Sequence, residues 1–151
     1  MKTFRIGLLA IAMLRSSIVS WGYDFEVNGI YYNINTGAKP TVSVTYGKTM
    51  YQGQIAIPET VTYEQTTYAV TEIGPNAFCK GEELTTIILP SSVKTIRKEA
   101  FSGCYKLTSI TLPNTITDIE QYAFSSCKEL TSITLPESIK AIKRATFYGC
   151  I

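Results

Sequence analysis

The amino-acid sequence predicts a mainly β fold, a solenoid of 23-residue coils that stack behind an N-terminal β-hairpin cap. The first observation is a repeat in the stretch 84–151, where Leu84, Leu107 and Leu130 stand 23 residues apart. The second is that three further sets keep this spacing: Pro90, Pro113 and Pro136; Phe101, Phe124 and Phe147; and Cys104, Cys127 and Cys150. The third is that the preceding segment alternates apolar and polar residues, as strands do. A fixed period of this length is typical of coils stacked in a row.

Residues 1–22 have the composition of an export signal. A short basic start precedes an apolar run, 6–14, that is too short to span a bilayer. Small residues, Ser20 and Gly22, occupy the positions that a signal peptidase reads, so we expect cleavage before Tyr23. Removing this segment would leave 11 basic and 12 acidic side chains and no transmembrane segment. The expected location is secreted, either extracellular or at the outer cell surface.

Residues 23–56 form the predicted β-rich cap. The dipeptide Asn28-Gly29 favours a tight two-residue turn and lies between two expected strands, 24–27 and 30–34. Further short strands are expected at 41–46 and 54–57, separated by a loop at 47–53. Seven of the ten tyrosines lie between residues 23 and 68. They fit strand packing, where aromatic residues are favoured, and they also fit an exposed platform for carbohydrate or protein.

Residues 57–83 resemble a first repeat that has been stretched. Ile57-Pro58 matches the Leu-Pro step of the later coils, and Ala77-Phe78 matches their Ala-Phe step. The extra residues between them predict an inserted hairpin, with strands at 61–63 and 68–70 and a turn at 64–67. Such an insertion would cover the apolar end of the stack, as terminal repeats of solenoids do.

Three regular coils follow, 84–106, 107–129 and 130–151, so that the predicted solenoid spans 57–151. Alternation along the first strand sends Ile87 and Leu89 inward and Thr86 and Ile88 outward. Proline ends each strand because it has no N–H to donate. On the return path of the coils, the residues expected to point inward are Val93, Ile96, Ala100, Phe101, Ile116, Ile119, Ala123 and Phe124.

The four cysteines suggest two interpretations. An even count in an exported protein invites disulfide bonds. Cys104, Cys127 and Cys150, however, hold equivalent positions and should point the same way, whereas Cys79 is out of register. We therefore expect reduced thiols that act as small core residues. Their spacing matches no zinc-ligand pattern, so no metal site is predicted.

Composition argues against several function classes. The chain has no histidine, the commonest general base and metal ligand, and only two aspartates, Asp24 and Asp118. No catalytic residue and no cofactor are expected, and the chain is not expected to be an enzyme. The balance of charge does not favour nucleic-acid binding.

The last coil ends one residue short of completion, and no polar cap closes it. Its apolar face and strand edge would then lie open. This predicts end-to-end self-association through the C-terminal coil, or a fragment of a longer array.

The repeat pattern Leu-Thr-x-Ile-x-Leu-Pro-x-x-Ile-x-x-Ile-x-x-x-Ala-Phe-x-x-Cys resembles the BspA-type leucine-rich repeats of bacterial surface proteins. The lead-in at 24–32, the Ile57-Pro58 step and the segment 68–74 are similar too. The resemblance implies a curved leucine-rich-repeat solenoid that serves as a secreted or surface-attached binding scaffold, in several members an adhesin. It supplies no catalytic residues.

The expected function is a protein-interaction module, adhesin-like, whose partner is an extracellular-matrix or cell-surface protein, with glycan as a further possibility. The candidate stripe consists of the outward strand positions Thr86, Ile88, Ser109, Thr111, Ser132 and Thr134. These residues also fit an inert, solvated surface. A rival basic stripe on the return path consists of Lys94, Arg97, Lys98, Lys140, Lys143 and Arg144. The alternative function is a structural spacer, or a fragment of a larger envelope protein, without a ligand of its own.

Overall fold

The computed structural model describes residues 22–150, so the predicted export signal lies, but for Gly22, outside the described residues. Within 22–150, ten β-strands form two sheets and no helix occurs. The mainly β class predicted from the sequence is therefore confirmed.

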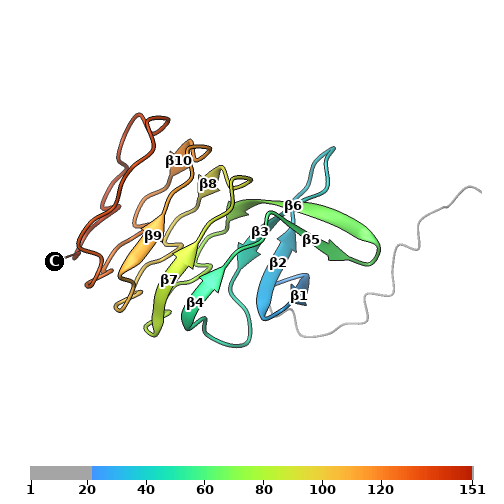
Figure 1. Ribbon diagram of the computed structural model, residues 1–151, viewed down its shortest axis with the longest axis horizontal. Helices are drawn as coiled ribbons and strands as arrows, with labels where there is room; N and C mark the ends of the chain where they lie inside the picture. The colour runs from blue at the N-terminus through green and yellow to red at the C-terminus, as the bar shows by residue number, and fades with distance from the viewer. Residues whose placement is uncertain (1–21, 151) are drawn as a thin grey trace, which may run out of the picture.

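Successive coils stack side by side along the long axis of the molecule (Figure 1). One face, the strand face, is the parallel sheet of β4 (Gly53–Ala56), β7 (Leu84–Ile88) and β9 (Ser109–Thr111). The return face carries β6 (Thr66–Ile73), β8 (Thr95–Ile96) and β10 (Asp118–Ile119), which are also parallel. Residues 23 positions apart are neighbours on both faces: Ile87 pairs with Ile110, and Ile96 pairs with Ile119.

The N-terminal strands extend the sheet of the return face. β1 (Phe25–Val27), β2 (Ile30–Ile34) and β3 (Thr41–Thr45) run antiparallel to one another, and β3 joins β6 in parallel. Asn28 and Gly29 connect β1 to β2 with φ values of 53° and 77°. Both residues thus adopt the left-handed conformation that a type I′ hairpin turn requires.

Most of the N-terminal aromatic rings pack rather than face solvent. Tyr31, Tyr32 and Tyr51 are buried, and the ring of Phe25 stacks on Tyr63 with centroids 4.3 Å apart. Tyr46 is the exception in this group, with an exposed fraction of 49%. The strand-packing interpretation of the tyrosines therefore fits the structure better than a broad aromatic platform.

The inserted hairpin consists of β5 (Thr60–Tyr63) and β6, and its turn is shorter than the predicted 64–67. Glu64 and Gln65 alone form the turn, with φ values of 46° and 65°. The following threonines, Thr66 and Thr67, belong to β6, and the hydroxyl of Thr67 is hydrogen-bonded to the hydroxyl of Thr62 on β5 at 3.1 Å. This pair of threonines extends the β5–β6 pairing closer to the turn than predicted. The polar residues at 64–67 alone did not indicate how far the pairing reaches.

A ladder of four phenylalanines runs through the core of the solenoid. The rings of Phe78, Phe101, Phe124 and Phe147 stack in sequence, with centroids 5.1, 5.2 and 5.6 Å apart. The return-path residues predicted to point inward, from Val93 to Phe124, are all buried. Ile87 and Leu89 are buried and Ile88 is exposed, which confirms the predicted alternation along β7.

Each coil places two residues in the left-handed region. The first set is Asn76, Glu99, Tyr122 and Ala145, and the second is Lys80, Gly103, Ser126 and Gly149. Glycine adopts this conformation without the steric cost that a Cβ atom imposes. The second position alternates between glycine and larger residues, which leaves Lys80 and Ser126 strained.

We expect Ser126→Gly to raise the free energy of unfolding by about 0.5–1 kcal/mol. Relief of left-handed strain contributes about 1–2 kcal/mol, and the added freedom of glycine in the unfolded chain offsets about 0.5–1 kcal/mol of it. Ser102→Gly is the matched control, because Ser102 has no positive φ, and it should destabilise the chain. Urea unfolding of both variants measures the difference; a loss of stability in Ser126→Gly would contradict this explanation.

All four cysteines are free thiols. The thiols of Cys104, Cys127 and Cys150 donate to the carbonyl oxygens of Phe78, Phe101 and Phe124, at 3.1, 3.2 and 3.1 Å. Each thiol thus contacts the backbone of the preceding coil instead of another sulfur. Burial raises the pKa of Cys104 to about 12 and raises the pKa of Cys127 as well.

These shifts predict slow alkylation of the folded protein. At pH 8 the thiolate, which is the reactive form, is scarce at Cys104 and Cys127. We expect iodoacetamide to leave both residues unmodified in the folded chain and to modify all four cysteines in urea, as measured by peptide mass spectrometry. Rapid modification of Cys127 in the folded chain would show that the ladder is open to solvent.

Candidate functional site

The strand face brings four residues of the candidate stripe together. Thr86 pairs with Ser109 and Ile88 pairs with Thr111, so the outward positions of β7 and β9 lie side by side. Ser109 and Thr111 are exposed, and Ile88 is 57% exposed despite being apolar. The parallel register thus arranges small hydroxyl side chains around one exposed isoleucine.

Two residues that the sequence interpretation missed extend this face. Gln54 and Ala56 of β4 pair with Thr86 and Ile88, and both are exposed. Aligning Ile57-Pro58 with Leu89-Pro90 would have predicted their position. Gln54 stands three residues before Ile57, as Thr86 stands three residues before Leu89. The face therefore spans three paired strands, and β4 begins it.

The last two residues of the candidate stripe, Ser132 and Thr134, are exposed but belong to no strand. A hollow of about 300 Å³ separates their segment from β9, and its lining includes Ser109, Thr111, Ser132 and Thr134. The prediction that Ser132 and Thr134 occupy outward strand positions is therefore wrong, although both side chains are exposed. The strand face is a continuous surface over β4, β7 and β9, and the cleft separates it from Ser132 and Thr134.

Two members of the rival basic stripe, Arg97 and Lys143, are paired with carboxylates on neighbouring coils. Arg97 lies between Glu72 and Glu120, with N–O distances of 2.9 and 3.0 Å. Hydrogen bonds that the guanidinium group donates to these two carboxylates raise its pKa. Lys143 pairs with Asp118 at 2.6 Å.

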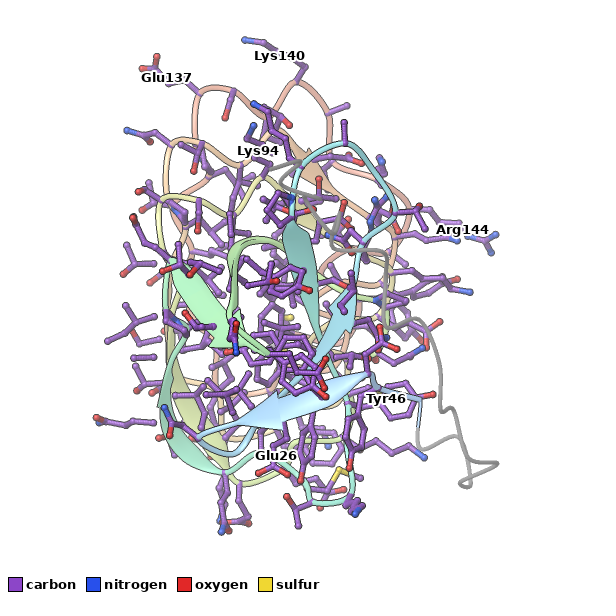
Figure 2. The ribbon with its side chains drawn as sticks, turned by 90° about the vertical axis from the view of Figure 1, so that its right-hand side faces the viewer. Glu26, Tyr46, Lys94, Glu137, Lys140 and Arg144 are labelled. Atoms are coloured by element: carbon purple, nitrogen blue, oxygen red, sulfur yellow. The ribbon has the colours of Figure 1, made fainter. Side chains whose placement is uncertain are left out.

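Other members of the basic stripe extend into solvent. Figure 2 shows Lys140 and Arg144 pointing away from the core at separate places on the outline of the molecule. A paired charge is a weak attractor for an acidic partner, and scattered charges create no concentrated field. The return face is therefore better explained by coil-to-coil ion pairs than by a binding function.

A second hollow, of about 330 Å³, lies where the 46–52 loop meets the first solenoid turn. Its lining includes the rings of Tyr46, Tyr51 and Phe78 and the half-buried thiol of Cys79. Burial raises the pKa of Cys79, which makes this thiol a poor nucleophile. The sequence interpretation did not single out this hollow, because its walls come from two segments far apart along the chain.

The described residues offer little catalytic chemistry. No group of three histidine, cysteine or carboxylate side chains gathers within 22–150 in a way that could hold a metal ion. The large pKa shifts among the tyrosines and cysteines come from burial, as for Tyr32, whose pKa rises to about 12. Residues 22–150 contain no helix that is long and apolar enough to cross a bilayer.

Residues 52–151 match the family described as BspA type leucine rich repeat region, in 6 copies. The chain belongs to this family. The match covers the strand face, the return face and the phenylalanine ladder, and it confirms the resemblance noted in the repeat pattern. No curated protein matches the chain at a significant level.

Solved leucine-rich repeat proteins share the fold. One from Bacteroides ovatus is 36% identical with a TM-score of 0.80, and the match covers 85% of this chain and 33% of that protein. One from Bacteroides capillosus is 28% identical with a TM-score of 0.68, covering 82% and 96%. A leucine rich cell surface protein from Faecalibacterium prausnitzii is 25% identical with a TM-score of 0.62, covering 83% and 40%. The chain thus spans about a third of the length of the Bacteroides ovatus protein.

Proposed function

We propose that this BspA-type leucine-rich repeat protein is a secreted or cell-surface interaction module, adhesin-like, that binds an extracellular-matrix or cell-surface protein without catalysis. The observation that carries the proposal is the register of the strand face. It places Gln54, Thr86 and Ser109 in one row, in which Thr86 is half-buried, and the exposed residues Ala56, Ile88 and Thr111 in a second. Because most side chains in these rows are small, a partner protein can come close to the strands themselves. The exposed side chain of Ile88 supplies an apolar contact for it.

Export through residues 1–22 is part of the proposal. The composition of this segment and the description of the Faecalibacterium prausnitzii relative as a cell surface protein support it. The predicted division into a cap of residues 23–56 and a solenoid of 57–151 is kept in this proposal with one change: β4 (Gly53–Ala56) is assigned to the solenoid, because it pairs with β7. The β5–β6 hairpin is proposed to cover the first coil. A glycan is the further candidate partner, and it would bind the same two rows of side chains.

A spacer without a ligand of its own is the second candidate. The observation that favours it is length, because the chain spans about a third of the Bacteroides ovatus protein. In a longer relative of that kind, binding residues could lie on other coils. Pairing of chains through the apolar end of the last described coil would belong to this candidate as well.

Direct binding of the chain 23–151 to a panel of matrix proteins, glycans and whole cells tests the proposal. We expect saturable binding to a protein of the panel, and we expect Thr111→Arg with Thr134→Arg to abolish it. Two guanidinium groups on the strand face would obstruct close approach and add unpaired charge.

The matched control carries Thr117→Arg with Ala141→Arg, which adds the same charges at exposed positions of the return path. This control should bind like the unmodified chain, and circular dichroism should show that both variants fold. Equal losses in both variants would place binding elsewhere than the strand face. No binding by the folded, monodisperse chain would favour the spacer.

A further inference from the structure

The hollow between the 46–52 loop and the first solenoid turn, which we call the loop hollow, takes one wall from each segment. Tyr46, Met50 and Tyr51 belong to the loop wall, and residues 76–81 form the solenoid wall. Its volume of about 330 Å³ is that of a site for a small molecule. Tyr46 and Met50 are 49% and 67% exposed, so a ligand reaches the hollow from solvent.

The loop wall is held in place by the ring and hydroxyl of Tyr31 and by the hydroxyl of Tyr51. Gly47 lies so close to the Tyr31 ring that a Cβ atom at this position would stand 2.1 Å from it. The hydroxyls of Tyr31 and Thr49 are hydrogen-bonded at 3.0 Å. The Tyr51 hydroxyl bridges the N–H of Tyr31 and the carbonyl oxygen of Thr45. The loop wall therefore has its shape without a ligand.

The solenoid wall is held by backbone hydrogen bonds to the next coil. The N–H groups of Phe78 and Lys80 donate to the carbonyl oxygens of Ala100 and Ser102, at 2.7 and 2.8 Å. The rings of Phe78 and Tyr51 lie with centroids 4.5 Å apart and join the two walls. Because both walls are fixed beforehand, a ligand would bind without the entropic cost of ordering them.

Lys80 supplies the charge of the loop hollow. Among the described residues that line the hollow, it is the one with an ionised side chain, and no carboxylate is present. Within 22–150 no ion pair involves Lys80. The Cys79 thiol is neutral at neutral pH because burial raises its pKa. A ligand in the hollow therefore meets apolar surface and one unpaired positive charge.

The backbone of Lys80 is a separate observation that favours a binding role. Its φ of 60° lies in the left-handed region, where a Cβ atom has a steric cost that glycine avoids. Gly103 and Gly149 hold the equivalent position in later coils, and of the two strained members of this set, Lys80 and Ser126, only Lys80 lines the hollow. Strained residues of this kind cluster at ligand sites.

We propose that the loop hollow binds a small apolar carboxylate. Its aromatic or aliphatic body would lie against Tyr46, Met50 and Phe78, and its carboxylate would pair with the Lys80 ammonium group. Burial of the body supplies affinity, and an ion pair at an apolar wall is stronger than one in open water. No residue of β4, β7 or β9 lines this hollow. The site is thus separate from the strand face, and its test does not depend on the proposed function.

Naphthalene-2-carboxylate is a fluorescent probe of this class, and 2-naphthalenemethanol is its neutral match. The chain 23–151 has no tryptophan, so the fluorescence of the probe is read without that background. We expect the acid to bind saturably and about tenfold more tightly than the alcohol. Lys80→Met keeps an apolar side chain of similar length and should abolish this difference. Lys94→Met is the matched control, because it removes the same charge from an exposed position outside the hollow, and it should preserve the difference.

Alkylation locates the bound probe. Cys79 lines the hollow and Cys150 is a half-buried thiol outside it, so each molecule carries its own control. Bound acid should slow the reaction of Cys79 with iodoacetamide and leave that of Cys150 unchanged, as measured by peptide mass spectrometry. Four results would each overturn the proposal: no saturable binding of the acid, equal affinities for acid and alcohol, an undiminished preference for the acid in folded Lys80→Met, or equal protection of both thiols.

Discussion

Replacing Phe101 with alanine is expected to lower the free energy of unfolding by about 3–5 kcal/mol. Phe101 is fully buried, and its ring stacks between Phe78 and Phe124 with centroids 5.1 and 5.2 Å away. The neighbouring rings belong to different coils, so neither can move into the space without disturbing its own backbone pairing. The substitution therefore removes apolar contacts and leaves a cavity in the middle of the stack.

The matched control for this substitution is Tyr105→Ala. Tyr105 lies four residues later in the same coil, but its side chain is 39% exposed and lies beneath the ammonium group of Lys128. We expect a loss of about 1 kcal/mol or less there, because an exposed cation–π contact is weak. Urea unfolding monitored by circular dichroism gives both values. Similar losses in the two variants would mean that the phenylalanine ladder does not organise the core.

Tyr51→Phe should destabilise the chain by about 1–3 kcal/mol for each buried backbone group that is left without a partner. The Tyr51 hydroxyl accepts from the N–H of Tyr31 at 2.9 Å and donates to the carbonyl oxygen of Thr45 at 2.8 Å. Tyr31 and Thr45 are register partners on β2 and β3, so this hydroxyl bridges the end of their ladder. Phenylalanine keeps the ring and removes only the bridge.

Tyr46→Phe is the control for the hydroxyl, because Tyr46 comes from the same loop and is half exposed. It should leave the unfolding midpoint nearly unchanged. An equally small effect of Tyr51→Phe would show that β2 and β3 close up and pair directly once the hydroxyl is gone. In that case Tyr51 would not be needed to hold the cap strands in place.

Periodicity made much of the solenoid predictable. A 23-residue spacing that holds for leucine, proline, phenylalanine and cysteine at once leaves few arrangements other than stacked coils in parallel register. The inward direction of Val93 and Ile96 followed from the same alignment, and both are fully buried. Where spacing changed, prediction was less accurate, as at the turn of the β5–β6 hairpin, whose two residues are Glu64 and Gln65.

Two features depended on contacts that no sequence pattern encodes. The bridge from Tyr51 to β2 and β3 joins residues brought together only by the fold. The cleft between β9 and the fourth coil is a second case, because Ser132 and Thr134 repeat the pattern of Ser109 and Thr111 and yet form no strand. Residues 107–113 and 130–136 have the same sequence, and yet only the first segment contains a paired strand. Strand pairing therefore also depends on contacts elsewhere that fix the distance between coils.

The candidate stripe shows the same division. Alternation within β7 was enough to predict that Thr86 and Ile88 face outward, and the repeat carried this to Ser109 and Thr111. The same prediction was not made for Gln54 and Ala56. The first repeat is interrupted after Pro58, so the strand that contains these two residues was assigned to the cap. Neither alternation nor register says which protein binds there.

Hydrogen–deuterium exchange of the chain 23–151, with and without the protein partner identified by direct binding, tests the central claim most directly. The account predicts that the partner slows exchange in peptides that cover 84–90, 107–113 and 130–136, and leaves 94–100, 117–122 and 140–146 unchanged. Slowed exchange confined to the return-path peptides would contradict the claim that the strand face is the binding surface.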